Sequence, residues 1–168
     1  FGSVDVAAGA EMRGGLLHIK GNAGQGVGAA EAGSRLGMRG GLIVVEGDAG
    51  DDVGLTMRRG LIAILGRAGD GLGRGMIAGS IFVFGPVGLR PGAGMKRGTI
   101  ALFTPEPPTL LPTFQASGRL RPPVLNLVLR HLRARNVPVP VPAFQGTITR
   151  YNGDLAARGQ GEILSWAL

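Results

Sequence analysis

The stretch Gly41-Leu-Ile-Val-Val-Glu-Gly47 decides the fold, because the chain repeats its pattern every nineteen residues. The later copies are Gly60-Leu-Ile-Ala-Ile-Leu-Gly66, Gly79-Ser-Ile-Phe-Val-Phe-Gly85 and Gly98-Thr-Ile-Ala-Leu-Phe103. An earlier copy, Gly15-Leu-Leu-His-Ile-Lys-Gly21, lies twenty-six residues upstream, and seven extra residues near positions 29–35 account for the difference. A repeat of about twenty residues is typical of a stacked solenoid.

The third and fifth positions of every copy are aliphatic, which predicts one strand in each repeat. Alternate residues of a strand face the same side, and β-branched residues favour strands. We expect two inward columns that stack from coil to coil, namely Leu17, Ile43, Ile62, Ile81 and Ile100, and Ile19, Val45, Ile64, Val83 and Leu102. The predicted fold is all-β: a right-handed, single-stranded parallel β-helix with coils of about nineteen residues and neighbouring coils about 4.8 Å apart.

Glycines keep the same nineteen-residue step, and we expect them where each coil turns. A positive φ at such a turn costs glycine little. The structural turn glycines predicted in this way are Gly47, Gly50, Gly54, Gly66, Gly69, Gly73, Gly85, Gly88 and Gly92. A methionine column follows the same step at Met38, Met57, Met76 and Met95.

The outward positions of the strands become apolar toward the later copies. These columns read His18, Val44, Ala63, Phe82 and Ala101, and Lys20, Glu46, Leu65, Phe84 and Phe103. Because a large apolar patch on a free surface usually marks an interaction site, we expect the tail or a partner subunit to cover this face.

The chain divides into a β-helix over residues 1–103 and a C-terminal tail over residues 104–168 that wraps the solenoid or partner subunits. Prolines at positions 105, 107 and 108 mark the break. An amphipathic helix is expected at about 122–135, and residues 145–151 read as a further strand, whereas residues 155–168 show no clear pattern. Phe1 is not a natural initiator, and residues 2–12 match the end of a coil, so we expect an N-terminal portion to be missing.

Composition limits the classes of function. The chain of 168 residues has no cysteine, so disulfides and thiolate metal sites are excluded. No apolar run approaches the ~18 residues of a membrane span, and no signal peptide is visible. We therefore expect a cytoplasmic protein without a membrane partner. The net charge of +7 points to an acidic partner or a polyanion.

No catalytic or metal-binding constellation is expected in this chain. The two histidines, His18 and His131, lie far apart on different elements. Asp48, Asp51 and Asp52 supply fewer oxygen ligands than a hard cation requires, so we interpret them as a solvated turn. The glycine-rich segment 24–28 resembles part of a phosphate-binding loop, but no helix clearly follows it, which favours a structural turn.

A basic ridge is the one constellation that suggests binding. The position after the methionine column holds Arg13, Arg39, Arg58, Ile77 and Lys96, and the next position includes Arg59 and Arg97. The simplest interpretation is a solvated face or a set of salt bridges to a neighbouring subunit. The second hypothesis is a track for a polyanion such as polyglutamate, held by charge-assisted hydrogen bonds. Nucleic acid is disfavoured because aromatic residues are not interleaved with the basic ones.

The candidate ligand-binding residues combine this ridge with arginines of the expected helix. They are Arg39, Arg58, Arg59, Lys96, Arg97, Arg130 and Arg133, and Arg119 and Arg121 before the helix add further charge.

The repeat resembles the GXGXG β-helix that the large chain of glutamate synthase shares with the β-helix subunit of formylmethanofuran dehydrogenase. The tail separates these families. Leu111-Pro-Thr-Phe114, the helix that ends Leu129-Arg-His-Leu132, and Arg150-Tyr-Asn-Gly-Asp-Leu155 with Gly159-Gln-Gly-Glu-Ile-Leu164 are similar to the end of the formylmethanofuran dehydrogenase chain. The resemblance covers about residues 12–168.

This resemblance implies a non-catalytic scaffold subunit in a one-carbon complex. In the bacterial formyltransferase/hydrolase complex, a formyl group moves from tetrahydromethanopterin to a methanofuran-type carrier and is hydrolysed to formate during formaldehyde oxidation. The implied partners are an amidohydrolase-like subunit that holds the metal, a formyltransferase subunit and a further small subunit. The family's carrier bears glutamates, so the basic ridge has a candidate ligand.

Two alternatives stay open. Archaeal relatives reduce CO2 onto methanofuran, and the arginine-rich, lysine-poor composition favours the bacterial version. The other alternative is a structural β-helix domain of glutamate synthase, against which the tail argues.

Overall fold

The structure is a computed structural model that describes residues 2–104, 106–120, 123–140, 143 and 146–167. The described part contains eight strands and one helix. In chain order they are β1 (Leu16–Ile19), β2 (Arg39–Val45), β3 (Arg59–Ile64), β4 (Ser80–Val83), β5 (Arg97–Leu102), β6 (Gln115–Leu120), α1 (Pro123–Arg133), β7 (Thr147–Gly153) and β8 (Gln160–Ala167).

All eight strands belong to one sheet with the order β1-β2-β3-β4-β5-β8-β7-β6. The pairs from β1 to β5 are parallel, and β8 pairs parallel with β5. The pairs β8–β7 and β7–β6 are antiparallel. The all-β prediction is therefore confirmed, but the sheet is mixed and open rather than wholly parallel, because the tail adds strands that run back along it.

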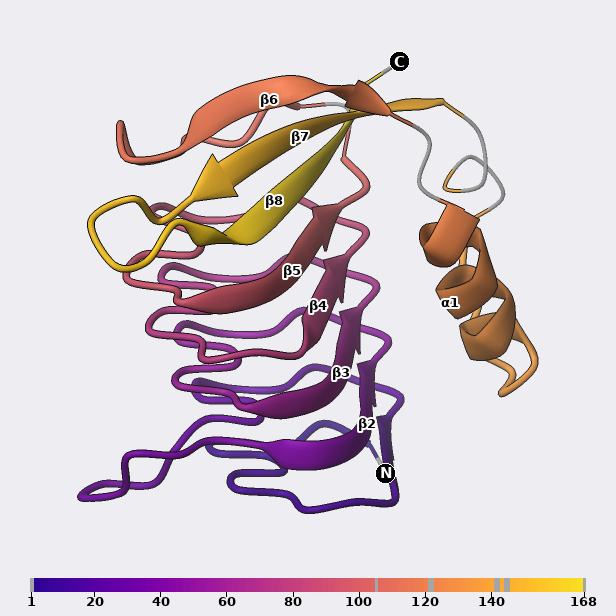
Figure 1. Cartoon of the computed structure of the whole chain (residues 1–168). Coiled ribbons are helices and arrows are strands. Elements are labelled where there is room, and N and C mark those ends of the chain that lie inside the picture. Colours follow the sequence, from indigo (N-terminus) through magenta and orange to yellow (C-terminus); the bar gives the residue numbers. More distant parts are fainter. Residues whose placement is uncertain (1, 105, 121–122, 141–142, 144–145, 168) are drawn as a thin grey trace.

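The repeats stack in the predicted nineteen-residue register (Figure 1). Ile62 pairs with Ile81, and Ile81 pairs with Ile100. A second line of parallel bridges crosses the loops of the same coils and joins Val4, Ala23, Ala49, Ala68 and Val87. Both predicted inward columns are buried, except for Leu17, which is half-buried.

Two different physical reasons require the repeated glycines. Gly73 has a φ of +66°, and a Cβ there would also lie 2.7 Å from Cδ1 of Ile100 in the next coil. Gly66 has no positive φ, but a Cβ there would lie 2.6 Å from the carbonyl oxygen of Gly47. The positive-φ prediction is thus confirmed for Gly54, Gly73 and Gly92. It is wrong for two columns, in which glycine instead permits close approach of neighbouring backbones: Gly47, Gly66 and Gly85, and Gly50, Gly69 and Gly88.

The methionine column locks each coil to the next one. A Cβ on Gly98 would lie 2.7 Å from the methyl carbon of Met76, so that methyl fills the space that glycine leaves. A Cβ on Gly161 would lie 2.6 Å from the methyl carbon of Met95 in the same way. Strand β8 therefore occupies the position that a further repeat would take, although its residues lie 63 positions after their partners in β5.

The tail covers the outward apolar face, as one of the two expected covers. Helix α1 lies beside the strands (Figure 1) and packs Leu125, Leu129 and Leu132 into a cluster with Phe82 and Phe103. The rings of Phe84 and Phe103 are stacked with centroids 4.8 Å apart. Burial of these side chains explains why the outward columns are apolar in the later coils.

The expected tail elements are present with shifted ends. The helix expected at about 122–135 is observed at Pro123–Arg133, and residue 122 lies outside the described residues. The strand expected at 145–151 is observed at Thr147–Gly153, and residue 145 also lies outside them. Strand β8 lies in the segment where the sequence shows no clear pattern.

Candidate anion-binding groove

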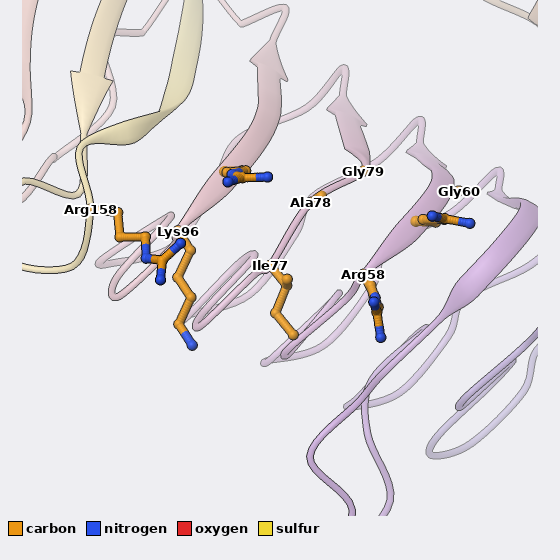
Figure 2. Close-up of a pocket in the computed structure, with 9 residues that line it drawn as sticks. Arg58, Gly60, Ile77, Ala78, Gly79, Lys96 and Arg158 are labelled. Carbon is orange, nitrogen blue, oxygen red and sulfur yellow. The ribbon is translucent and has the colours of Figure 1, made fainter.

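A cationic groove crosses the corner of the coils where β3, β4 and β5 begin (Figure 2). It encloses a volume of about 420 Å³. Its lining residues are Arg58, Arg59, Gly60, Ile77, Ala78, Gly79, Lys96, Arg97 and Arg158. Four of the seven residues predicted to bind a ligand thus line one groove, namely Arg58, Arg59, Lys96 and Arg97.

The repeat itself places these side chains. In each coil the methionine is fully buried, and the chain then leaves the interior to start the next strand. The two residues after Met57 are therefore exposed, and so are the two after Met95. In the coil between them, the same two positions hold Ile77 and Ala78. The parallel register then lines up the cations of the outer two coils on one face.

Arg158 completes the groove and was not predicted. It lies in the turn between β7 and β8, and Figure 2 shows its side chain beside Lys96. The pairing of Arg97 with Gln160 brings this turn to the groove. A signal for it existed, because Gly161-Glu-Ile-Leu continues the pattern of Gly98-Thr-Ile-Ala. The long separation along the chain hid the register.

The charge of the groove is not compensated within the described part of the chain. None of its five cations has an acidic group within ion-pair distance there, whereas ion pairs form elsewhere, as between Arg74 and Asp52 at 2.7 Å. Arg97 donates a hydrogen bond from Nε to Oε1 of Gln160 at 3.0 Å, which orients its guanidinium without neutralising it. The groove is therefore suited to an anion that brings its own carboxylate or phosphate groups.

Arg39 lies next to the groove but is engaged with an acid. It pairs with Arg59 in the strand register, yet its Nη2 donates to Oε2 of Glu11 at 3.0 Å. The pKa of Glu11 is lowered by hydrogen bonds from Ser34 and from Arg39. Arg39 does not line the groove, so its expected place in a common binding surface is wrong for this structure.

The helix arginines also lie apart from the groove. Arg130 and Arg133 belong to α1, which packs on the outward face of the strands. Arg133 donates from Nη2 to the carbonyl oxygen of Val139 at 2.9 Å. Arg119 lies on β6, and Arg121 falls outside the described residues. The structure therefore does not bring the helix arginines together with the ridge.

The remaining polar residues have structural partners. Nε2 of His18 lies 2.6 Å from Oε1 of Glu46, and His131 contacts Arg135 on α1. Asp51 accepts a hydrogen bond from the backbone N–H of Asp70 in the next coil at 2.7 Å, so it links coils. Among the described residues, no group of three or more His, Cys, Asp or Glu side chains is placed to hold a metal ion.

No described helix combines the length and apolar character that a membrane span requires. The fold and groove together define an all-β protein of stacked, glycine-rich repeats with a cationic groove on one corner.

The comparisons with known proteins add one close structural match. No protein-family model matches the sequence, and no curated protein matches it. The chain is similar to a chain in the crystal structure of the formyltransferase/hydrolase complex (FhcABCD) from Methylorubrum extorquens in complex with methylofuran. The identity is 38% and the TM-score 0.89 over 99% of the present chain, which spans 62% of the matched chain.

Proposed function

We propose that this chain is a structural subunit of a formyltransferase/hydrolase complex. The observation that carries the proposal is the match at 38% identity and a TM-score of 0.89 over 99% of the chain. That observation supports this complex over a domain of glutamate synthase, which the sequence left as the alternative.

The finer fold assignment belongs to the same proposal. The stacked parallel strands and the second line of bridges through Ala23 and Ala49 support a right-handed, single-stranded parallel β-helix of the GXGXG type. We assign it to residues 1–103 and the covering tail to residues 104–168. The pairing of β8 with β5 makes the tail part of the same structural unit.

The chain acts in this proposal as a scaffold without catalytic residues. General acid–base or nucleophilic catalysis requires side chains held within hydrogen-bond reach of each other and of a substrate. His18 contacts Glu46 on the strands, and His131 contacts Arg135 on α1, so the two histidines serve separate elements. Transfer of the formyl group from tetrahydromethanopterin and its hydrolysis to formate belong to a formyltransferase subunit and a metal-holding amidohydrolase-like subunit, in the cytoplasm.

The groove gives this scaffold a binding role. The matched complex was solved with methylofuran. We propose that Arg58, Arg59, Lys96 and Arg97, joined by Arg158, hold the glutamate-bearing tail of a methanofuran-type carrier. Arg39, Arg130 and Arg133 would contribute to the wider positive field rather than to direct contacts, because they lie outside the groove.

The test of assembly is mass spectrometry of the native complex purified through this chain from its source cells. We expect formyltransferase and amidohydrolase-like subunits and a furan that bears glutamates. Recovery of the 17.2 kDa chain alone, or of one long flavin and iron–sulfur polypeptide, would contradict the proposal.

The test of the carrier role compares two triple variants with the same change in charge. Replacement of Arg58, Arg59 and Arg97 by Glu should release the carrier from the purified complex. Replacement of Arg35, Arg67 and Arg90 by Glu, which are exposed and outside the groove, should leave it bound. Equal retention in both variants would refute carrier binding in the groove and leave the assembly proposal intact.

A further inference from the structure

The groove has two cationic ends separated by an apolar coil. One end carries Arg58 and Arg59, and the other carries Lys96 and Arg97 with Arg158. Ile77 occupies the position between Arg58 and Lys96 (Figure 2), and Ala78 takes the corresponding place between Arg59 and Arg97. The charges therefore form two separate clusters rather than a continuous track.

The separation of the clusters follows from the repeat. Neighbouring parallel strands lie about 4.8 Å apart, so positions two coils apart are separated by roughly 10 Å. A single compact anion such as phosphate contacts only one cluster at a time. A ligand with two anionic groups about 10 Å apart engages both clusters at once and places its linking segment over Ile77 and Ala78.

We propose that the groove is a two-point clamp for an acidic, peptide-like chain. Its carboxylates bind the two cationic clusters, and the methylene groups of the intervening acidic side chains lie on Ile77 and Ala78. An extended chain advances about 3.3 Å per residue, so carboxylates about three residues apart match the clusters. This inference rests on the proposed carrier site and specifies the ligand spacing that the site selects.

The lining of the groove favours an acidic peptide over a nucleic acid. Single-stranded nucleic acids bind through aromatic side chains on which bases stack, in addition to basic groups. The groove is lined by arginine, lysine, glycine, alanine and isoleucine residues only. It offers charge and a small apolar floor, which suits carboxylates on aliphatic stems.

The experiment is calorimetric titration of the purified chain with oligoglutamates of two to eight residues at low salt. We expect affinity to rise steeply, about tenfold, when the peptide reaches about four residues and spans both clusters, and to rise only slightly thereafter. A smooth increase with every added residue would overturn the clamp. Inorganic phosphate or an oligonucleotide of equal charge that binds as tightly as the long peptide would overturn it too.

Three variants test the two-point geometry. Lys96→Gln should reduce the affinity for the six-residue peptide about fivefold and weaken the length threshold, because one cluster loses charge. Ile77→Lys should fill the gap, so that the two-residue peptide gains about fivefold and the threshold disappears. Ile77→Leu, which keeps the apolar floor, should behave as the parent.

The outcomes separate this inference from the site on which it rests. If no oligoglutamate binds, both the clamp and the carrier site are wrong. If all lengths bind to the parent without a threshold and Ile77→Lys tightens all of them equally, the carrier site stands and the clamp is wrong.

Discussion

The closest packing in this protein occurs between glycine residues of successive coils. At Gly66 the space for a side chain is taken by the main chain of Gly47, whose carbonyl oxygen and carbon would lie 2.6 and 2.7 Å from a Cβ. Backbone atoms cannot move aside as a flexible side chain does, since the coil-to-coil hydrogen bonds hold them. The N–H of Gly66 itself donates to the carbonyl oxygen of Gly47 at 3.1 Å.

We expect Gly66→Ala to lower the free energy of unfolding by about 3 kcal/mol or to prevent folding, because the methyl group forces two coils apart. Gly14→Ala is the matched control: Gly14 also lacks a positive φ, and a Cβ there meets nothing within 4 Å. Its effect should stay within about 0.5 kcal/mol. Urea unfolding of both variants measures the difference, and equal losses would show that the coils are not packed as described.

At the scale of the element, α1 is the part of the tail whose sequence most clearly matches its task. Its buried residues Leu125, Leu129 and Leu132 recur at helical spacing and meet the outward face of the strands. Arg130, His131 and Arg133 lie in its last turn, where positive charge is favourable at a helix C-terminus. The helix thus protects the aromatic ladder of the later coils from solvent.

We expect Leu129→Ala to lower the free energy of unfolding by about 3 kcal/mol, because Leu129 is fully buried between α1 and the strands. Leu127→Ala carries the same chemical change on the same helix, but Leu127 is 68% exposed. It should change stability by less than about 0.5 kcal/mol. Thermal or urea unfolding compares them, and a similar loss for both would contradict the packing of α1 on this face.

At the scale of the whole molecule, the tail returns to the coils and closes their C-terminal end. Strand β8 extends the parallel array, and Phe114 and Ile163 join the inner core. The buried carboxylate of Asp154 fastens the β7–β8 turn, because its Oδ2 accepts from the N–H of Gly94 at 2.9 Å. The same turn carries Arg158 to the groove, so closure of the fold and completion of the groove depend on one connection.

The pH dependence of stability should reflect this connection. Burial alone raises the pKa of Asp154, but the N–H groups of Gly94 and Ala156 donate hydrogen bonds to its carboxylate, and the net pKa is lowered below 3.8. A lowered folded-state pKa means that the carboxylate stabilises the fold above the unfolded value and that this contribution is lost as the pH falls through the folded value.

We therefore expect Asp154→Asn to be less stable than the parent by on the order of 1 kcal/mol near neutral pH, and the gap to narrow below about pH 4. Asp5→Asn, at an exposed position, serves as the control. Urea unfolding between about pH 3 and pH 7 gives the comparison; a gap that stays constant over this range would argue against a stabilising carboxylate at Asp154.

The nineteen-residue period by itself determined the class of fold, the register of the parallel strands, the inward columns and four of the cations of the groove. Those features depend on neighbours one repeat away, which a periodic pattern reports directly. The reason for the glycines was only partly predictable. Positive φ at Gly54 follows from turn chemistry, whereas the need for glycine at Gly66 arises from contact with another coil.

Only the tertiary structure decided how the tail folds back. The parallel place of β8, the antiparallel strands beside it and the arrival of Arg158 at the groove join residues 63 positions apart in pairs such as Arg97 with Gln160. The same level of structure separated Arg39, through Glu11, and Arg130 and Arg133, through α1, from a ridge that the sequence could not divide. Contacts of this kind depend on which surfaces the completed coils leave uncovered, and a local pattern of residues carries no record of them.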